Sequence, residues 1–136
     1  MISIIYYTET GNTEAMAEAI KVGGEEAGKE VNFVAVDGAS SEDVENADVI
    51  FLGCPAKGDE EIEDLTFRPY IESVMDELKA KKVILFGSYA WNEGEWIENW
   101  KNEMEDNGVD IVETFKAYDY PEDSVLDELK ELGQKY

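Results

Sequence analysis

Short apolar runs alternate with amphipathic stretches along this 136-residue chain. The apolar runs are rich in Val, Ile, Phe and Tyr, and they occupy residues 2–7, 31–36, 48–53, 82–87 and 109–118. Helical patterns alternate with them at about 13–27, 41–46, 66–79, 94–107 and 122–134, and Gly28 and Gly108 are placed to end two of these helices. Three apolar runs are nearly continuous, as is typical of parallel strands buried on both faces. The pattern therefore predicts an α/β fold, with a parallel sheet covered by helices on both faces, in a single domain of residues 1–136.

The composition is strongly acidic. Thirty-three Asp and Glu residues against 11 Lys and Arg give a formal net charge of −22. This charge argues against nucleic acids and anionic membranes as partners. It suits partners with basic docking patches, although acidic residues that only keep an abundant protein soluble account for it equally well.

The residue types that the chain lacks exclude several kinds of site. Cys54 is the single cysteine, so no disulfide forms within the chain, and the lack of His excludes His-based triads and His metal sites. The first residues enter a strand directly, and no apolar run approaches the length of a membrane span. We therefore expect a soluble cytoplasmic protein without a metal site.

Ligands of such folds bind outside the carboxyl ends of the strands. Three loops with unusual sequences follow strands here, at residues 8–13, 54–63 and 88–95. In the first, Thr and Asn side chains surround a glycine where the first strand turns into a helix, and no Lys or Arg is present. Hydroxyl groups and the free N–H groups of the helix start predict a phosphate site made of neutral donors. The alternative is a well-capped helix with Asn12 or Thr13 as the N-cap residue. A nucleoside-triphosphate loop is excluded, because its glycine–lysine pattern is missing.

The other two loops suggest a planar ligand. The second contains Gly58-Asp59, a turn pair that supports either orientation of the peptide between them, although by itself it indicates an ordinary surface turn. The third places Tyr89 and Trp91 among polar residues and glycines, where aromatic side chains are useful for covering something flat. Trp96 and Trp100 on the next helix are better explained by core packing. A ligand with a phosphate at one end and a planar group held between two loops has the shape of flavin mononucleotide (FMN).

The three loops together resemble those of the flavodoxins, specifically the short-chain type of anaerobic bacteria, over essentially the whole chain. The matching motifs are Thr8-x-Thr10-Gly11-x-Thr13, Gly53-Cys54-Pro55-Ala56 through Gly58-Asp59-Glu60, and Gly87-Ser88-Tyr89-Ala90-Trp91. The resemblance implies a flavodoxin-like three-layer sandwich with a five-stranded parallel sheet in the order 2-1-3-4-5. Flavodoxin itself is the standard example of this order, with FMN at the switch point.

The resemblance also implies roles for individual residues. Thr8, Thr10, Asn12 and Thr13 would hold the phosphate with loop N–H groups and Ser88, while Trp91 would stack on the outer face of the ring. Residues 56–58 would border the inner face, backbone groups of 58–60 and 89–91 would meet the polar edge of the ring, and Glu60 would accept the flavin N3–H. The expected cofactor-binding set is Thr8, Glu9, Thr10, Gly11, Asn12, Thr13, Pro55, Ala56, Lys57, Gly58, Asp59, Glu60, Ser88, Tyr89, Ala90, Trp91 and Gly94. Two positions depart from the family pattern: Lys57 replaces a frequent Met, and Ala90 a frequent Gly.

By the same resemblance, the chain is a monomeric low-potential one-electron carrier and not an enzyme. It would hold FMN non-covalently, cycle between semiquinone and hydroquinone, and exchange electrons with pyruvate oxidoreductase, a ferredoxin-type reductase, hydrogenase or nitrogenase. The serious alternative is an FMN-dependent reductase of the same fold. A response-regulator receiver, a C-x5-R phosphatase and an EF-hand calcium site each lack their required residues.

Overall fold

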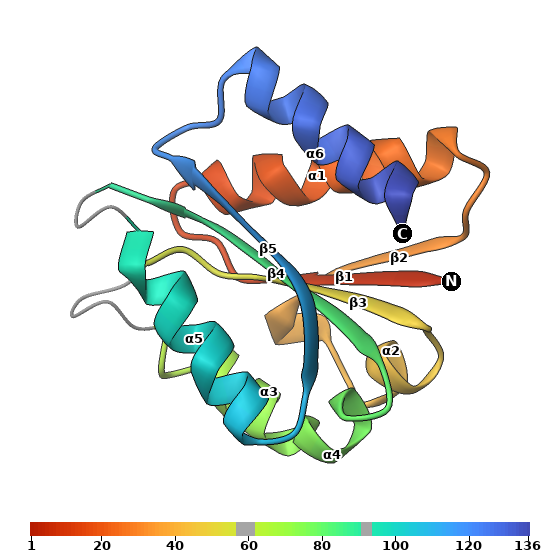
Figure 1. Cartoon of the computed structure of the whole chain (residues 1–136), viewed down its shortest axis with the longest axis vertical. Helices are drawn as coiled ribbons and strands as arrows, with labels where there is room; N and C mark the ends of the chain where they lie inside the picture. The colour runs from red at the N-terminus through yellow and green to blue at the C-terminus, as the bar shows by residue number, and fades with distance from the viewer. Residues whose placement is uncertain (57–61, 91–93) are drawn as a thin grey trace.

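The structure is a computed structural model that describes residues 1–56, 62–90 and 94–136. Within these residues, five parallel strands form one sheet in the order β2-β1-β3-β4-β5, which confirms the predicted topology (Figure 1). The strands are β1 (Ile2–Tyr6), β2 (Val31–Ala35), β3 (Val49–Gly53), β4 (Lys82–Tyr89) and β5 (Asp110–Tyr118).

Helices cover both faces of the sheet (Figure 1). One face carries α1 (Asn12–Glu26) and α6 (Asp123–Lys135). The other carries α2 (Glu42–Glu45), α3 (Phe67–Ser73), α4 (Met75–Leu78) and α5 (Glu95–Asp106), and a 3-10 turn, η1 (Val36–Gly38), follows β2. The α/β three-layer architecture is therefore as predicted.

Neighbouring strand residues supply two separate cores, because successive side chains point to opposite faces of a sheet. Ile4 packs in the core that includes residues of α1 and α6, whereas Ile5 packs in the core that includes residues of α3 and α5. Trp96 and Trp100 are buried in the second core, which confirms the prediction that they are core residues.

Three local details differ from the sequence prediction. The helix expected over 66–79 is interrupted at Val74, whose φ of −113° lies outside the helical range while its side chain is buried. The helix expected over 41–46 is reduced to the single turn of α2. Strand β4 continues two residues beyond the predicted 82–87, so that Ser88 pairs with Ala117 and Tyr89 with Tyr118.

The predicted helix ends are confirmed. Gly28 and Gly108 have φ values of +77° and +87°, and they follow α1 and α5. No described helix has both the length and the apolar character needed to cross a bilayer.

Candidate functional site

The first loop ends in a left-handed glycine. Gly11 is the N-cap residue of α1 with a φ of +91°, and its N–H donates to Thr8 Oγ1 at 3.1 Å. Its carbonyl accepts the N–H of Ala15 at 3.0 Å, which begins the helix. Asn12 and Thr13 are the first two residues of α1, so the alternative in which either residue is the N-cap is wrong.

The start of α1 has the properties of an anion site. The N-cap residue Gly11 has no side chain with which to cap this helix end. The first-turn N–H groups of a helix have no partner within it, and they carry partial positive charge. Residues 8–13 contain no Lys or Arg, so neutral donors are the only groups that this loop offers to an anion.

Ser88 joins the three loops. Its Oγ lies 3.2 Å from Thr13 Oγ1, and both side chains are buried. Its carbonyl accepts the N–H of Ala56 in the second loop at 2.9 Å. Each hydroxyl has one donor and two acceptor positions, so the pair retains hydrogen-bonding capacity beyond their mutual contact. Thus residues from the ends of β1, β3 and β4 meet at one edge of the sheet.

The second loop is tied to the sheet at its beginning. Cys54 donates its backbone N–H to the carbonyl of Phe86 at 3.1 Å, and its buried Sγ accepts the N–H of Glu63 at 3.4 Å. A Cβ on Gly87 would lie 2.0 Å from the carbonyl oxygen of Cys54, so only glycine allows this approach. Cys54 is therefore a buried thiol packed at the beginning of the second loop.

Glu63 is a buried carboxylate that the sequence analysis missed. Its two oxygens accept the N–H groups of Leu65, Thr66 and Phe67 at 2.8, 2.8 and 2.7 Å. It therefore satisfies the donors at the beginning of α3 and fixes the chain after the second loop. An acidic residue four positions before the first helical residue was the signal available in the sequence.

The predicted positions of the second and third loops fall partly within the described residues. Pro55 and Ala56 are half-buried, whereas Lys57, Gly58, Asp59, Glu60 and Trp91 lie outside the described residues.

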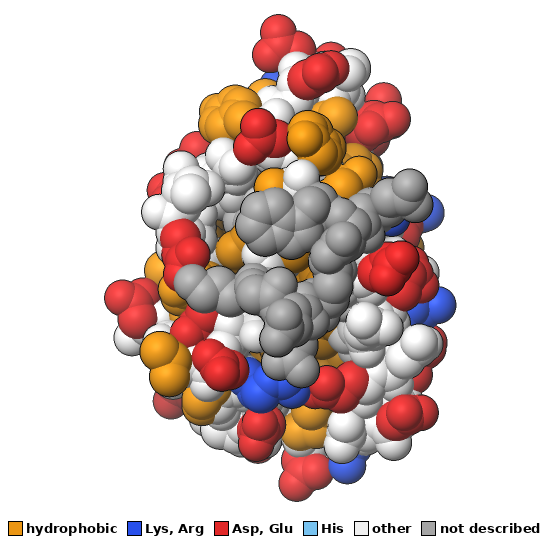
Figure 2. Space-filling model, turned by 90° about the vertical axis from the view of Figure 1, so that its left-hand side faces the viewer, with side chains coloured by type: hydrophobic (Ala, Val, Ile, Leu, Met, Phe, Trp, Pro, Cys, Tyr) orange, Lys and Arg blue, Asp and Glu red, His pale blue; other side chains and the backbone are white. Residues whose placement is uncertain are grey.

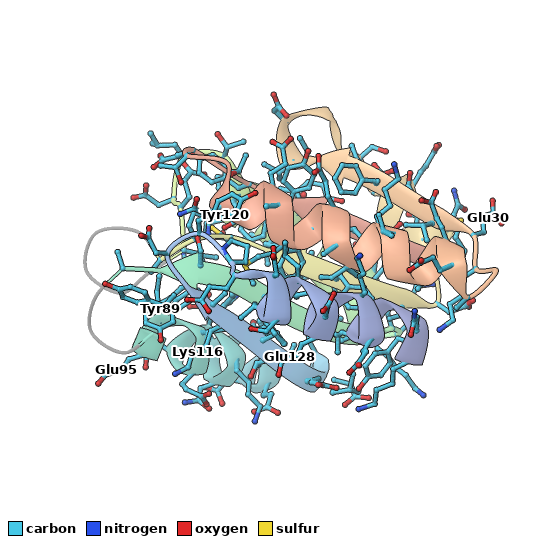
Figure 3. The ribbon with its side chains drawn as sticks, turned by 90° about the horizontal axis from the view of Figure 1, so that it is seen from above. Glu30, Tyr89, Glu95, Lys116, Tyr120 and Glu128 are labelled. Atoms are coloured by element: carbon cyan, nitrogen blue, oxygen red, sulfur yellow. The ribbon has the colours of Figure 1, made fainter. Side chains whose placement is uncertain are left out.

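The third loop begins from an aromatic cluster around Tyr89. The ring centroid of Tyr89 lies 5.9 Å from that of Trp96 and 5.5 Å from that of Tyr118. Lys116 lies beside Tyr89 (Figure 3), with its Nζ 5.7 Å from the ring centroid. Gly94, the N-cap residue of α5, has a φ of +75°, and a Cβ there would lie 2.8 Å from Lys116 Cδ. Tyr118 and Lys116 were missed, because it is the pairing of β4 with β5 that brings them beside Tyr89.

The remaining predicted residues line the same edge. Thr10 and Ala90 are exposed, and Glu9 accepts the hydroxyl hydrogen bond of Tyr7 at 2.8 Å. This hydrogen bond, together with burial and nearby acidic groups, raises the pKa of Tyr7 to about 12.

The electrostatic surroundings are negative. Burial and then the carboxylates of Glu14, Glu18 and Asp37 raise the pKa of Tyr6, at the end of β1. Figure 2 looks onto this edge and shows acidic side chains distributed around it. The site therefore combines neutral anion donors, hydroxyls and aromatic rings within an acidic surface.

Comparison with known proteins agrees with this arrangement. The flavodoxin family model matches residues 4–133. A flavodoxin of Megasphaera elsdenii is 43% identical over 134 residues, covering 98% of this chain and 96% of the relative. The chain belongs to the flavodoxin family. A flavodoxin of Clostridium beijerinckii is 39% identical, covering 98% of this chain and 97% of the relative.

Solved flavodoxins share the fold. The solution structure of two-electron reduced Megasphaera elsdenii flavodoxin superposes with a TM-score of 0.89 at 41% identity, covering all of both chains. A flavodoxin from the domain Archaea gives 0.81 at 26% identity, covering 99% of this chain and 95% of the other. Through its membership of this family, the 136-residue chain is an FMN-binding electron carrier and not an enzyme, so the reductase alternative is not supported.

Proposed function

We propose that the three joined loops hold FMN in one orientation. The phosphate lies at the start of α1, against residues 8–13 and Ser88, and the ring lies between the second and third loops. The observation that carries this assignment is the buried hydroxyl pair of Thr13 and Ser88 beside a helix start whose N-cap residue is a glycine without a side chain. The other expected site residues, including those outside the described ranges, complete the site in this proposal.

The chain's own groups have distinct tasks. Hydroxyls and N–H groups bind the phosphate without cancelling its charge. The close approach of Gly87 to Cys54, and the hydrogen bond from Ala56 to Ser88, hold the second loop against the third. Bound FMN supplies the capacity to take up and release single electrons. The protein positions the cofactor and sets the electrostatic field around it.

The field favours a low reduction potential. Among residues 8–13 no cation balances the phosphate, and the chain carries a net charge of −22. Added negative charge on the cofactor is therefore disfavoured. For a one-electron couple, each kcal/mol of this repulsion lowers the potential by about 43 mV.

The partners are redox enzymes with basic docking patches, such as pyruvate oxidoreductase, a ferredoxin-type reductase, hydrogenase or nitrogenase. Opposite potentials speed the encounter of such proteins and orient them. In this proposal residues 1–136 act as one domain, as a monomer in the cytoplasm.

Replacement of Thr13 tests the phosphate assignment. Thr13→Val keeps the shape of the side chain and removes its hydroxyl, so the FMN dissociation constant should rise about tenfold, the value for a hydrogen bond to a charged group. Riboflavin, which has no phosphate, should bind the variant and the parent equally. Thr114→Val on β5 is the control.

Titration of the apoprotein with both flavins distinguishes the outcomes. An equal loss of affinity for FMN and for riboflavin, or no loss of affinity for either flavin, contradicts the phosphate assignment. Stepwise anaerobic reduction of the FMN-loaded protein then tests the carrier: two separate one-electron steps support it, whereas a single two-electron step contradicts it.

A further inference from the structure

A surface groove separates the first halves of α1 and α6. It has a volume of about 550 Å³, and Ala15, Ala19 and Leu126 contribute apolar side chains to it. Ala19 is buried, and the other two are half-buried. We call it the α1–α6 groove. None of its lining residues belongs to the expected cofactor site.

Glycines explain where the groove lies. Farther along the two helices, a Cβ on Gly23 would lie 2.0 Å from the carbonyl oxygen of Lys130, and a Cβ on Gly133 would lie 2.2 Å from that of Ile20. The helices therefore meet backbone to backbone in their second halves. Side chains separate them in their first halves, where the groove is found.

Large apolar side chains are exposed at the groove. Val22 and Tyr120, which both line it, are 39% and 61% exposed. Tyr118 is 64% exposed but does not line the groove, and its ring packs against that of Tyr89 instead. Among the described residues, Leu65 is the only other large hydrophobic side chain with comparable exposure. Clustered exposed aromatic and aliphatic groups are typical of protein docking sites.

The rim of the groove is acidic. Glu18 projects from α1, and Asp123 and Asp127 project from α6. Lys130, at the end where the helices meet, is the one basic residue in the described lining. An apolar floor between carboxylates is complementary to a segment in which Lys or Arg residues flank an apolar side chain.

The groove opens toward the cofactor edge. Tyr120 lies just after the carboxyl end of β5, and Ala15 lies in the first turn of α1, directly after the phosphate loop. Seen from above, Tyr120 lies near the beginning of α1, at the same end of the strands as Tyr89 (Figure 3). A partner seated in the groove therefore lies beside the cofactor loops.

We propose that the α1–α6 groove is a docking surface for redox enzymes, and that it seats a segment of the partner in which Lys or Arg residues flank one apolar side chain. The inference rests on the proposed electron-carrier function. Carboxylates over the whole surface attract a basic partner, and the groove fixes its position through contact with Tyr120 and Val22.

Charge reversal in the groove tests the electrostatic part. The groove variant is Glu18→Lys with Asp127→Lys, and the control is Glu72→Lys with Glu105→Lys on the opposite face; all four residues are exposed helix positions. Both variants change the net charge equally. The assay is the second-order rate constant for reduction of the FMN-loaded protein by a purified ferredoxin-type reductase with its pyridine nucleotide.

The groove variant should lose about tenfold in rate at low salt and the control less than about twofold, and the difference should shrink at high salt. Equal losses in both variants, or no loss in the groove variant, overturn the proposal. FMN affinity and the rate of reduction by dithionite must be unchanged in both variants. A protein that fails to bind FMN or to accept single electrons contradicts the carrier function instead.

Replacement of the exposed apolar side chains tests the contact itself. Val22→Ser with Tyr120→Ser should slow reduction about threefold at high salt, where charge attraction is screened. Leu65→Ser is the control, because Leu65 is 84% exposed and lies outside the groove. A loss in the control equal to that in the groove variant assigns docking to the cofactor edge in general and overturns the proposal.

Discussion

Gly11 offers a sharp test of the link between backbone conformation and phosphate binding. It has a φ of +91° at the N-cap of α1, and a Cβ built there meets no atom within 4 Å. Gly28, at the other end of α1, has a φ of +77° and equally open surroundings. The substitutions Gly11→Ala and Gly28→Ala therefore impose backbone strain without a steric clash, one at the cofactor site and one away from it.

The cost follows from the left-handed conformation alone. An L-residue with a Cβ pays about 1–2 kcal/mol to occupy this region, so a Gly28→Ala apoprotein that keeps its conformation should lose about that much free energy of unfolding, and the Gly11→Ala apoprotein should lose no more than this. In Gly11→Ala, relaxation toward negative φ turns away the N–H that donates to Thr8 Oγ1. Binding of FMN must then restore the strained conformation. If this costs about 1.4 kcal/mol, the FMN dissociation constant becomes tenfold larger.

Two measurements on each apoprotein check this reasoning: urea unfolding, and flavin titration followed by fluorescence quenching. We expect a stability loss in Gly11→Ala no larger than that in Gly28→Ala, about tenfold weaker FMN binding in Gly11→Ala, and unchanged FMN binding in Gly28→Ala. Riboflavin should bind all three proteins alike. If Gly28→Ala weakens FMN binding as much as Gly11→Ala does, the effect is one of global stability, and the role assigned to the N-cap glycine is refuted.

Further predictions concern the loops and the field around them. Gly87→Ala should destabilise the protein by about 3 kcal/mol, measured by urea unfolding, because the new Cβ meets the Cys54 carbonyl at 2.0 Å; a cost below about 1 kcal/mol would contradict this packing. Lys116→Gln should lower the FMN reduction potential by about 20 mV in a redox titration, because a positive charge beside Tyr89 is removed; an unchanged potential would show that the ammonium is screened. The hydrogen bond that raises the pKa of Tyr7 to about 12 requires its protonated form. Its contribution to stability is therefore complete below pH 10 and is lost as the pH rises toward 12, and Glu9→Gln should reduce this loss in alkaline denaturation.

The layered fold was predictable because it depends on patterns that are local in sequence. The apolar pattern that identifies a strand or an amphipathic helix is contained within about one element, as the position of Trp100 on the buried face of its helix shows. The order of the strands came from the family resemblance, and the structure confirms it. The left-handed Gly28 and Gly108 were predictable for the same local reason.

The contacts that assemble the site are not local, and residue patterns alone do not reveal them; it was the family resemblance that placed Ser88 with Thr13 at the phosphate. Thr13 and Ser88 meet across 75 positions, through a strand that runs two residues longer than its apolar pattern. Tyr118 reaches Tyr89 only through the pairing of β4 with β5. The break at Val74 arises where a buried β-branched side chain leaves the helical conformation, and the helical period of the sequence does not reveal it.

Helix α1 links the two functional surfaces in the proposed arrangement. Its first turn supplies N–H groups to the phosphate, and its next turns form one wall of the α1–α6 groove. The close approach at Gly23 and Gly133 packs α1 directly against the backbone of α6, so the two walls of the groove are held together by this contact. A partner seated in the groove is therefore positioned relative to the phosphate end of the cofactor by a single packed element.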